Sequence, residues 1–237
     1  MSKVKNETKN TCKNNLGFPG EIFGFAAIAV LLITLIISII LYVQYDPTFN
    51  IFTHYVSQLG GVPKGNSNGV IYNSATVFNF GMLLAVPLRI GFLISLVFFV
   101  WRVGSNKILS IVSFATGLLS SAGWLILGLV PFSSNLQLHL TGAAVYFLGA
   151  TSFQLLFAIT EFKTKQVPKH LPLLGLLNLA TFSVFSYFLI QVEVRQVSGM
   201  LEQPILEWIV YAVSIIWVLA HAFYMRQERD IKTKNLI

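Results

Sequence analysis

The chain has 237 residues, of which 55% are hydrophobic and only 11% are charged, and its formal net charge is +7. Soluble globular proteins carry about 25% charged residues, so this composition excludes a soluble enzyme and a disordered chain and indicates an integral membrane protein. The single cysteine, Cys12, excludes an intrachain disulfide and a cysteine-rich metal site.

Six apolar runs are long enough to cross a bilayer, because roughly 20 helical residues span the hydrocarbon core. The predicted fold is therefore an all-α polytopic membrane protein with a basic leader (1–20), a transmembrane domain (21–225) and a basic tail (226–237). The predicted transmembrane helices are 22–43, 74–101, 108–130, 138–160, 171–190 and 205–225. The second run contains Pro87 and Arg89, so a five-helix alternative treats it as a re-entrant element.

The basic residues predict the orientation of the chain. With six helices, 13 of the 16 Lys and Arg residues fall on one side of the membrane. The positive-inside rule then places both termini in the cytoplasm, and we expect a multi-pass protein of a prokaryotic plasma membrane. The basic leader and tail have no aromatic residues interleaved with the basic ones, so we expect them to contact anionic lipid and not nucleic acid.

The longest loop on the outer side, 44–71, contains a predicted amphipathic surface helix. Asp46-Pro47 is typical of a helix start, and Gly60-Gly61 provides a stop. Between them, apolar residues recur at helical spacing, and the polar edge of the same helix carries three side chains. The apolar residues are Phe52, Tyr55, Val56 and Leu59, and the polar ones are His54, Ser57 and Gln58.

Small residues recur at three- and four-residue spacing along the third predicted helix. Small side chains allow the close backbone approach on which helix packing in membranes depends, so this pattern predicts a tightly packed, central helix. The residues are Ser110, Ser113, Gly117, Ser120, Ser121 and Gly123.

Arg89 lies near the predicted bilayer centre, where an arginine costs at least ~2.5–3.5 kcal/mol. All nine acidic residues lie in loops or at helix ends, so its partners must be amides such as Asn178 or Gln154, carbonyls, water or an anion. One interpretation is a cavity that admits an anionic headgroup, and the other is a structural arginine.

Several polar residues near the outer side are candidates for chemistry. His54 and His139 with a carboxylate would suffice to bind zinc, and Ser57 with His139 would form a nucleophilic pair. Neither possibility is supported by a local motif such as His-Glu-x-x-His, and His139 alternatively bonds across its loop to order the start of its helix. We expect Asn79 to form an interhelical hydrogen bond and His221 to contact the inner membrane interface.

Two stretches resemble a known family. They are Ser57-Gln-Leu-Gly followed by Val77-Phe-Asn-Phe-Gly-Met-Leu-Leu, and Gly128-Leu-Val-Pro-Phe followed by His139 and Tyr146-Phe147. The chain resembles the prokaryotic six-helix membrane family called domain of unknown function 998. More distantly, it is similar to the six-helix families of GPI-lipid remodelling and autophagy modulation. The family pattern marks the positions Ser57, Leu59, Gly60, Phe78, Asn79, Pro131 and His139.

The resemblance implies a six-helix fold and a shared outer site, while the activity of the family is not established. Where the family often has an acidic residue after the serine, this chain has Gln58, which weakens an acid–base role for the first loop.

Three functional hypotheses follow from the sequence. The first is a lipid-interacting protein that binds a headgroup through Arg89, Asn79 and His139, with membrane lipids as partners, no nucleic acid and no cofactor. The second is an outward-facing metal- or acid–base-dependent lipid-modifying enzyme using His54, Ser57 and His139. The third is a small transporter with Arg89 as its anion site.

Overall fold

The computed structural model describes residues 19–61, 73–131, 133–195 and 204–234. Within these residues it is all helical, and six helices are long and apolar enough to cross a membrane, which confirms the predicted fold class. The helices are α2 (Glu21–Tyr45), α3 (Asn73–Arg102), α4 (Lys107–Leu129), α5 (Leu136–Lys163), α6 (His170–Arg195) and α7 (Pro204–Lys234).

Pro87 does not interrupt α3, which runs from Asn73 to Arg102. Proline removes one backbone hydrogen bond, and transmembrane helices tolerate this where neighbouring groups satisfy the freed carbonyl. The six-helix prediction is therefore correct and the five-helix alternative is wrong.

The last helix extends beyond its predicted end into the basic segment 226–237. It continues to Lys234, where Arg229 forms an ion pair with Glu21 at the start of α2. Most of the predicted leader, 1–20, lies outside the described residues. The ion pair connects the first and last helices at the end of the bundle that the positive-inside rule places in the cytoplasm.

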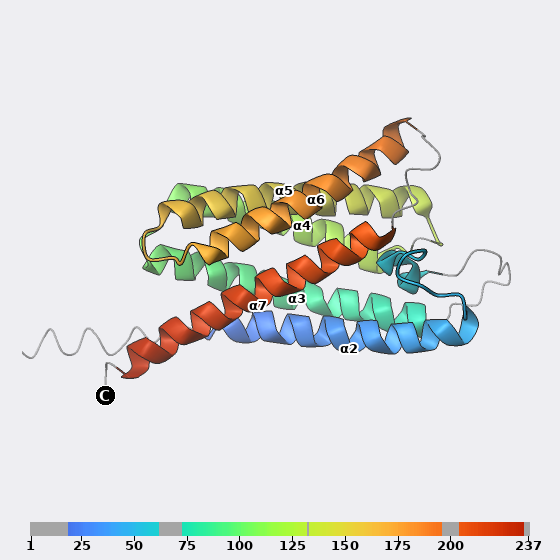
Figure 1. Ribbon diagram of the computed structural model, residues 1–237, viewed down its shortest axis with the longest axis horizontal. Helices are drawn as coiled ribbons and strands as arrows, with labels where there is room; N and C mark the ends of the chain where they lie inside the picture. Colours follow the sequence, from blue (N-terminus) through green and yellow to red (C-terminus); the bar gives the residue numbers. More distant parts are fainter. Residues whose placement is uncertain (1–18, 62–72, 132, 196–203, 235–237) are drawn as a thin grey trace, which may run out of the picture.

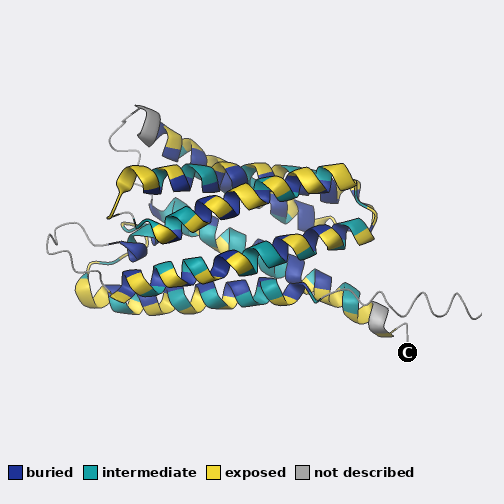
Figure 2. Ribbon diagram, turned by 180° about the vertical axis from the view of Figure 1, so that it is seen from behind, coloured by how far each residue is buried: buried dark blue, intermediate teal, exposed yellow. Residues whose placement is uncertain are grey.

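Consecutive helices pack side by side, and α7 crosses obliquely to close the bundle against α2 and α6 (Figure 1). The start of α2 and the end of α7 lie at the same end of the bundle, as an even number of spans requires. Large apolar side chains such as Ile33, Phe80 and Leu148 are exposed around the helices, and exposed positions follow the outer faces of the bundle (Figure 2).

The tightest packing in the bundle is between α4 and α5. A Cβ atom at Gly149 would lie 2.6 Å from the backbone nitrogen of Ser120, and one at Gly123 would collide with the backbone nitrogen of Tyr146. Gly123 and the other small residues of α4 are buried. The predicted role of these small residues in close packing is confirmed.

The predicted amphipathic helix of the first outer loop is wrong in extent. Residues 46–54 form turns, and only Val56–Gly60 is helical, as the short 3₁₀ helix η1. Val56 and Leu59 are buried against Phe78 and Tyr42, whereas Phe52 is 63% exposed. We call residues 46–61 the cap and this end of the bundle the cap side. The apolar residues recur at helical spacing, but the chain turns before residue 55, so Val56 and Leu59 are buried while Phe52 is not.

Candidate functional site

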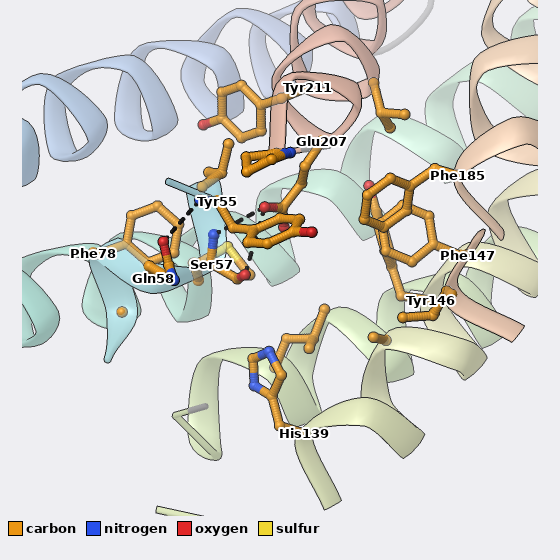
Figure 3. Close-up of a pocket in the computed structure, with 18 of the residues that line it drawn as sticks. Tyr55, Ser57, Gln58, Phe78, His139, Tyr146, Phe147, Phe185, Glu207 and Tyr211 are labelled. Atoms are coloured by element: carbon orange, nitrogen blue, oxygen red, sulfur yellow. Dashed lines mark hydrogen bonds between the residues drawn. The ribbon is translucent and has the colours of Figure 1, made fainter. Parts of the chain in front are cut away.

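A cavity of about 680 Å³ lies beneath the cap (Figure 3). Its wall is mostly apolar and comes from the cap and from every transmembrane helix except α2. The helical wall residues include Phe78, Asn79, Trp124, Leu127, His139, Ala143, Tyr146, Phe147, Phe185, Leu189, Glu207, Val210 and Tyr211. The cavity is thus formed jointly by five helices.

Glu207 supplies the one carboxylate found on the described wall. It lies in the first turn of α7, where the positive end of the helix dipole stabilises a negative charge. Its Oε2 accepts hydrogen bonds from the backbone nitrogen of Ser57 at 3.2 Å and from Ser57 Oγ at 3.5 Å. Ser57 therefore binds a carboxylate from α7, and no local sequence pattern indicates this pairing because the two residues are 150 positions apart.

His139 lines the same cavity and is 7% exposed. Its Nδ1 lies 2.8 Å from the carbonyl oxygen of Val130 at the end of α4. Because a carbonyl only accepts, Nδ1 carries the hydrogen, and Nε2 of the neutral ring is an acceptor. The prediction that His139 bonds across its loop is confirmed. Asn135, whose side chain caps α5 through the Leu138 nitrogen, helps to order the same turn.

Asn79 faces the cap and not another transmembrane helix. Its Nδ2 donates a hydrogen bond of 2.9 Å to the carbonyl oxygen of Gly60. A second hydrogen bond holds the other edge of the cap: Trp208 Nε1 of α7 donates to the carbonyl oxygen of His54 at 2.9 Å. The expected interhelical bond of Asn79 is therefore wrong, and Asn79 instead holds the cap over the cavity that it lines.

His54 does not meet His139 on the cavity wall. Its Nε2 lies 3.3 Å from Asp46 Oδ2, and its Nδ1 contacts the Asn50 nitrogen and Thr53 Oγ1 within the cap. Hydrogen bonds from the Thr48 hydroxyl and the Thr48 backbone nitrogen hold the pKa of the Asp46 carboxyl below its usual value. Within the described residues, no three His, Cys, Asp or Glu side chains gather closely enough to hold a metal ion.

Arg89 lies just behind the cavity wall and does not line the cavity. Its Nε and Nη2 donate to the hydroxyls of Ser121 and Ser120 at 3.2 and 2.9 Å. Its guanidinium carbon lies 5.1 Å from the ring centroid of Trp124 and 5.5 Å from that of Tyr146. The predicted amide partners are wrong, since Asn178 instead accepts a hydrogen bond from Ser214.

A second polar pair lies in the opposite half of the bundle, away from the cap. His221 and Glu161 are each 1% exposed, and His221 Nε2 lies 2.9 Å from Glu161 Oε1. The prediction that His221 contacts the membrane interface is therefore wrong. Glu161 and His221 lie on different helices, so their pairing depends on how α5 and α7 pack.

Comparison with known proteins shows one match. The family model of the Frag1/DRAM/Sfk1/Cwh43P N-terminal domain matches residues 19–227. This match supports the more distant of the two resemblances, to the autophagy-modulator family, whereas the resemblance to the family called domain of unknown function 998 stays a prediction. No curated protein and no solved structure matches the chain.

Proposed function

The chain belongs to the Frag1/DRAM/Sfk1/Cwh43P family of membrane proteins, and we propose that it binds a membrane lipid in the cavity beneath the cap. The observation that carries this proposal is a mostly apolar cavity of about 680 Å³ with a few polar groups on its wall. Ligand sites in proteins have this composition, in which apolar side chains bury the ligand and a few polar groups orient it.

The position of the cavity also fits a ligand that comes from the bilayer. Phe185 and Leu189 of α6 and Pro204 and Val210 of α7 belong to the wall. Because both helices contribute to the wall, we propose that a lipid enters sideways between them. The positive-inside rule places this entrance in the outer leaflet of what we expect to be the plasma membrane.

The candidate residues have different roles in this proposal. His139 and Asn79 are on the wall and contact the polar part of the lipid, whereas Arg89 holds the rings of Trp124 and Tyr146 from behind. Membrane lipids are the partners, and nucleic acid has no role. Anion transport past Arg89 remains a prediction without a supporting contact, because the guanidinium is engaged by serines and rings.

Filling the cavity tests the proposal. Ala143 is buried on the wall, so Ala143→Phe places a ring where the lipid lies. We expect native mass spectrometry of the purified protein to show at least about tenfold less co-purifying lipid, which corresponds to about 1.4 kcal/mol of binding free energy.

Leu148→Phe is the matched control, because Leu148 is 51% exposed on the same helix. This variant is expected to retain lipid as the wild type does. Equal lipid retention by Ala143→Phe and the wild type, with both folded, would contradict the proposal.

A lipid-modifying activity is the second candidate, because Ser57, His139 and Glu207 share one cavity. A hydroxyl, an imidazole and a carboxylate are groups that acid–base chemistry uses. The test is incubation of the protein with a lipid labelled in its headgroup and in its acyl chain, followed by chromatography. Product that forms with the wild type and not with His139→Ala supports this candidate, and unchanged lipid contradicts it.

A further inference from the structure

The described cavity wall carries an acidic side chain and no permanently cationic one. Glu207 is a carboxylate, and no Lys or Arg is found among the described residues of the wall. Arg89, the intramembrane cation, is separated from the cavity by the rings of Trp124 and Tyr146 and is hydrogen bonded to two serines. An anion that entered the cavity would therefore meet a like charge in surroundings of low dielectric constant, where repulsion is strong.

The Glu207 carboxylate has capacity for a further donor. A carboxylate offers about four acceptor positions. The donors to Glu207 are the backbone nitrogen and hydroxyl of Ser57, which both bond to Oε2, and the backbone nitrogen of Val56. These bonds and the first turn of α7 fix the carboxylate at the cavity wall (Figure 3). Glu207 is thus held in place for a cationic group that carries N–H or polarised C–H bonds.

Aromatic rings surround the same space. Tyr55 lies beside Glu207, and Phe147 and Phe185 lie across the cavity from it (Figure 3). The face of an aromatic ring attracts a cation within about 6 Å, and quaternary ammonium groups are recognised in this way. Two rings of the wall, Trp124 and Tyr146, already bind the guanidinium of Arg89 from the other side.

We infer that the cavity selects a ligand whose charged end is an ammonium group, with Glu207 as its counter-ion and the aromatic wall around it. This inference rests on the proposed lipid-binding function and names its ligand class: lipids with an amine or quaternary amine headgroup. This ligand class differs from the anionic headgroup that the position of Arg89 in the sequence predicts. Free soluble amines share this chemistry, and the experiment separates the two sources.

The experiment presents the purified full-length protein with equimolar phosphatidylethanolamine, phosphatidylcholine and phosphatidylglycerol of identical acyl chains and measures bound lipid by native mass spectrometry. All three lipids carry the phosphate, and phosphatidylglycerol has glycerol in place of the amine and therefore a net negative charge. We expect the wild type to retain the two amine lipids at least about tenfold over phosphatidylglycerol. Glu207→Gln keeps the shape and removes the charge, so this variant is expected to lose the preference.

Asp46→Asn is the matched control, because it removes a carboxylate from the same side of the bundle that does not line the cavity. It is expected to keep the preference for amine lipids. Addition of millimolar choline or ethanolamine distinguishes lipid headgroups from free soluble amines as the source of the ammonium group. If bound lipid is not displaced, the site is assigned to lipid headgroups. If it is displaced, the site also binds free amines.

Two results would overturn the inference. One is that the wild type retains phosphatidylglycerol as well as or better than the amine lipids. This result would exclude a preference for amine headgroups even if Glu207→Gln does not fold. The other is an unchanged preference in folded Glu207→Gln. Retention of no lipid at all by the wild type would instead refute the underlying proposal of lipid binding.

Discussion

The variant His221→Ala is expected to lower the free energy of unfolding by about 1–3 kcal/mol, the usual cost of leaving a buried polar group without its hydrogen-bond partner. Glu161 is 1% exposed and its Oε1 is bonded to His221 Nε2. Without the imidazole, this carboxyl group stays buried in the bundle with its Oε1 unpaired. Thermal and denaturant unfolding of the purified protein in detergent, followed by tryptophan fluorescence, measures the loss.

The hydrogen bonds of His221 explain why the pair acts as a unit. Its Nδ1 lies 2.7 Å from the carbonyl oxygen of Trp217, so Nδ1 carries a hydrogen. Its Nε2 faces a carboxyl oxygen, and one proton must lie between the two atoms, on the ring or on Glu161, because two acceptors would repel. The hydrogen bond between the imidazole and the carboxyl therefore depends on the presence of both residues.

A double-mutant cycle separates this explanation from simple packing. The single variants Glu161→Met and His221→Leu and their combination form the cycle. The combination replaces both polar groups by apolar ones, which is often nearly neutral for buried pairs. The double variant is expected to be more stable than His221→Ala alone. Additive losses, or a loss below about 1 kcal/mol in His221→Ala, would show that the pair is not coupled.

The variant Gly123→Val is expected to destabilise the bundle by about 3 kcal/mol or more, at the upper end of overpacking effects. The added Cβ would collide with the backbone nitrogen of Tyr146 and would lie 2.8 Å from the carbonyl oxygen of Gly142. Backbone atoms cannot rotate away as a flexible side chain does, so α4 and α5 must separate.

This separation is also expected to weaken lipid binding. Trp124 follows Gly123 directly, and the rings of Trp124 and Tyr146 form part of the cavity wall in front of Arg89. Thermal unfolding and native mass spectrometry on the same sample report both effects. Ala115→Val is the control, because Ala115 is exposed on the same helix. Gly123→Val with unchanged stability would contradict the close contact of α4 and α5.

The helices could be predicted closely because their signal is local. A run of apolar residues must form a helix in a membrane, since no water satisfies its backbone groups, and the predicted 74–101 corresponds to Asn73–Arg102. The cap could not be predicted in the same way. The spacing of its apolar residues fits a helix. Hydrogen bonds from Asn79 of α3 and Trp208 of α7 hold the cap in place, and these contacts favour turns.

The candidate site was only partly accessible from sequence. Ser57, Asn79 and His139 were selected and all line one cavity, whereas His54 bonds within the cap and Arg89 lies behind the wall. Glu207 is one of nine acidic residues in loops or at helix ends, and nothing in its local sequence distinguishes it. Its pairing with Ser57 exists only because α7 returns to the cap side of the bundle.

The sequence by itself determined that this chain is a six-helix membrane protein with an intramembrane arginine, because hydropathy and insertion cost are properties of each segment. Only the tertiary structure decided which polar groups meet. Pairing depends on the rotation and crossing of packed helices, and these are set by close contacts such as that of Gly123 with Tyr146. The sequence alone points to Arg89 as the charged residue that binds a ligand. The structure instead places Glu207 on the cavity wall and Arg89 behind it.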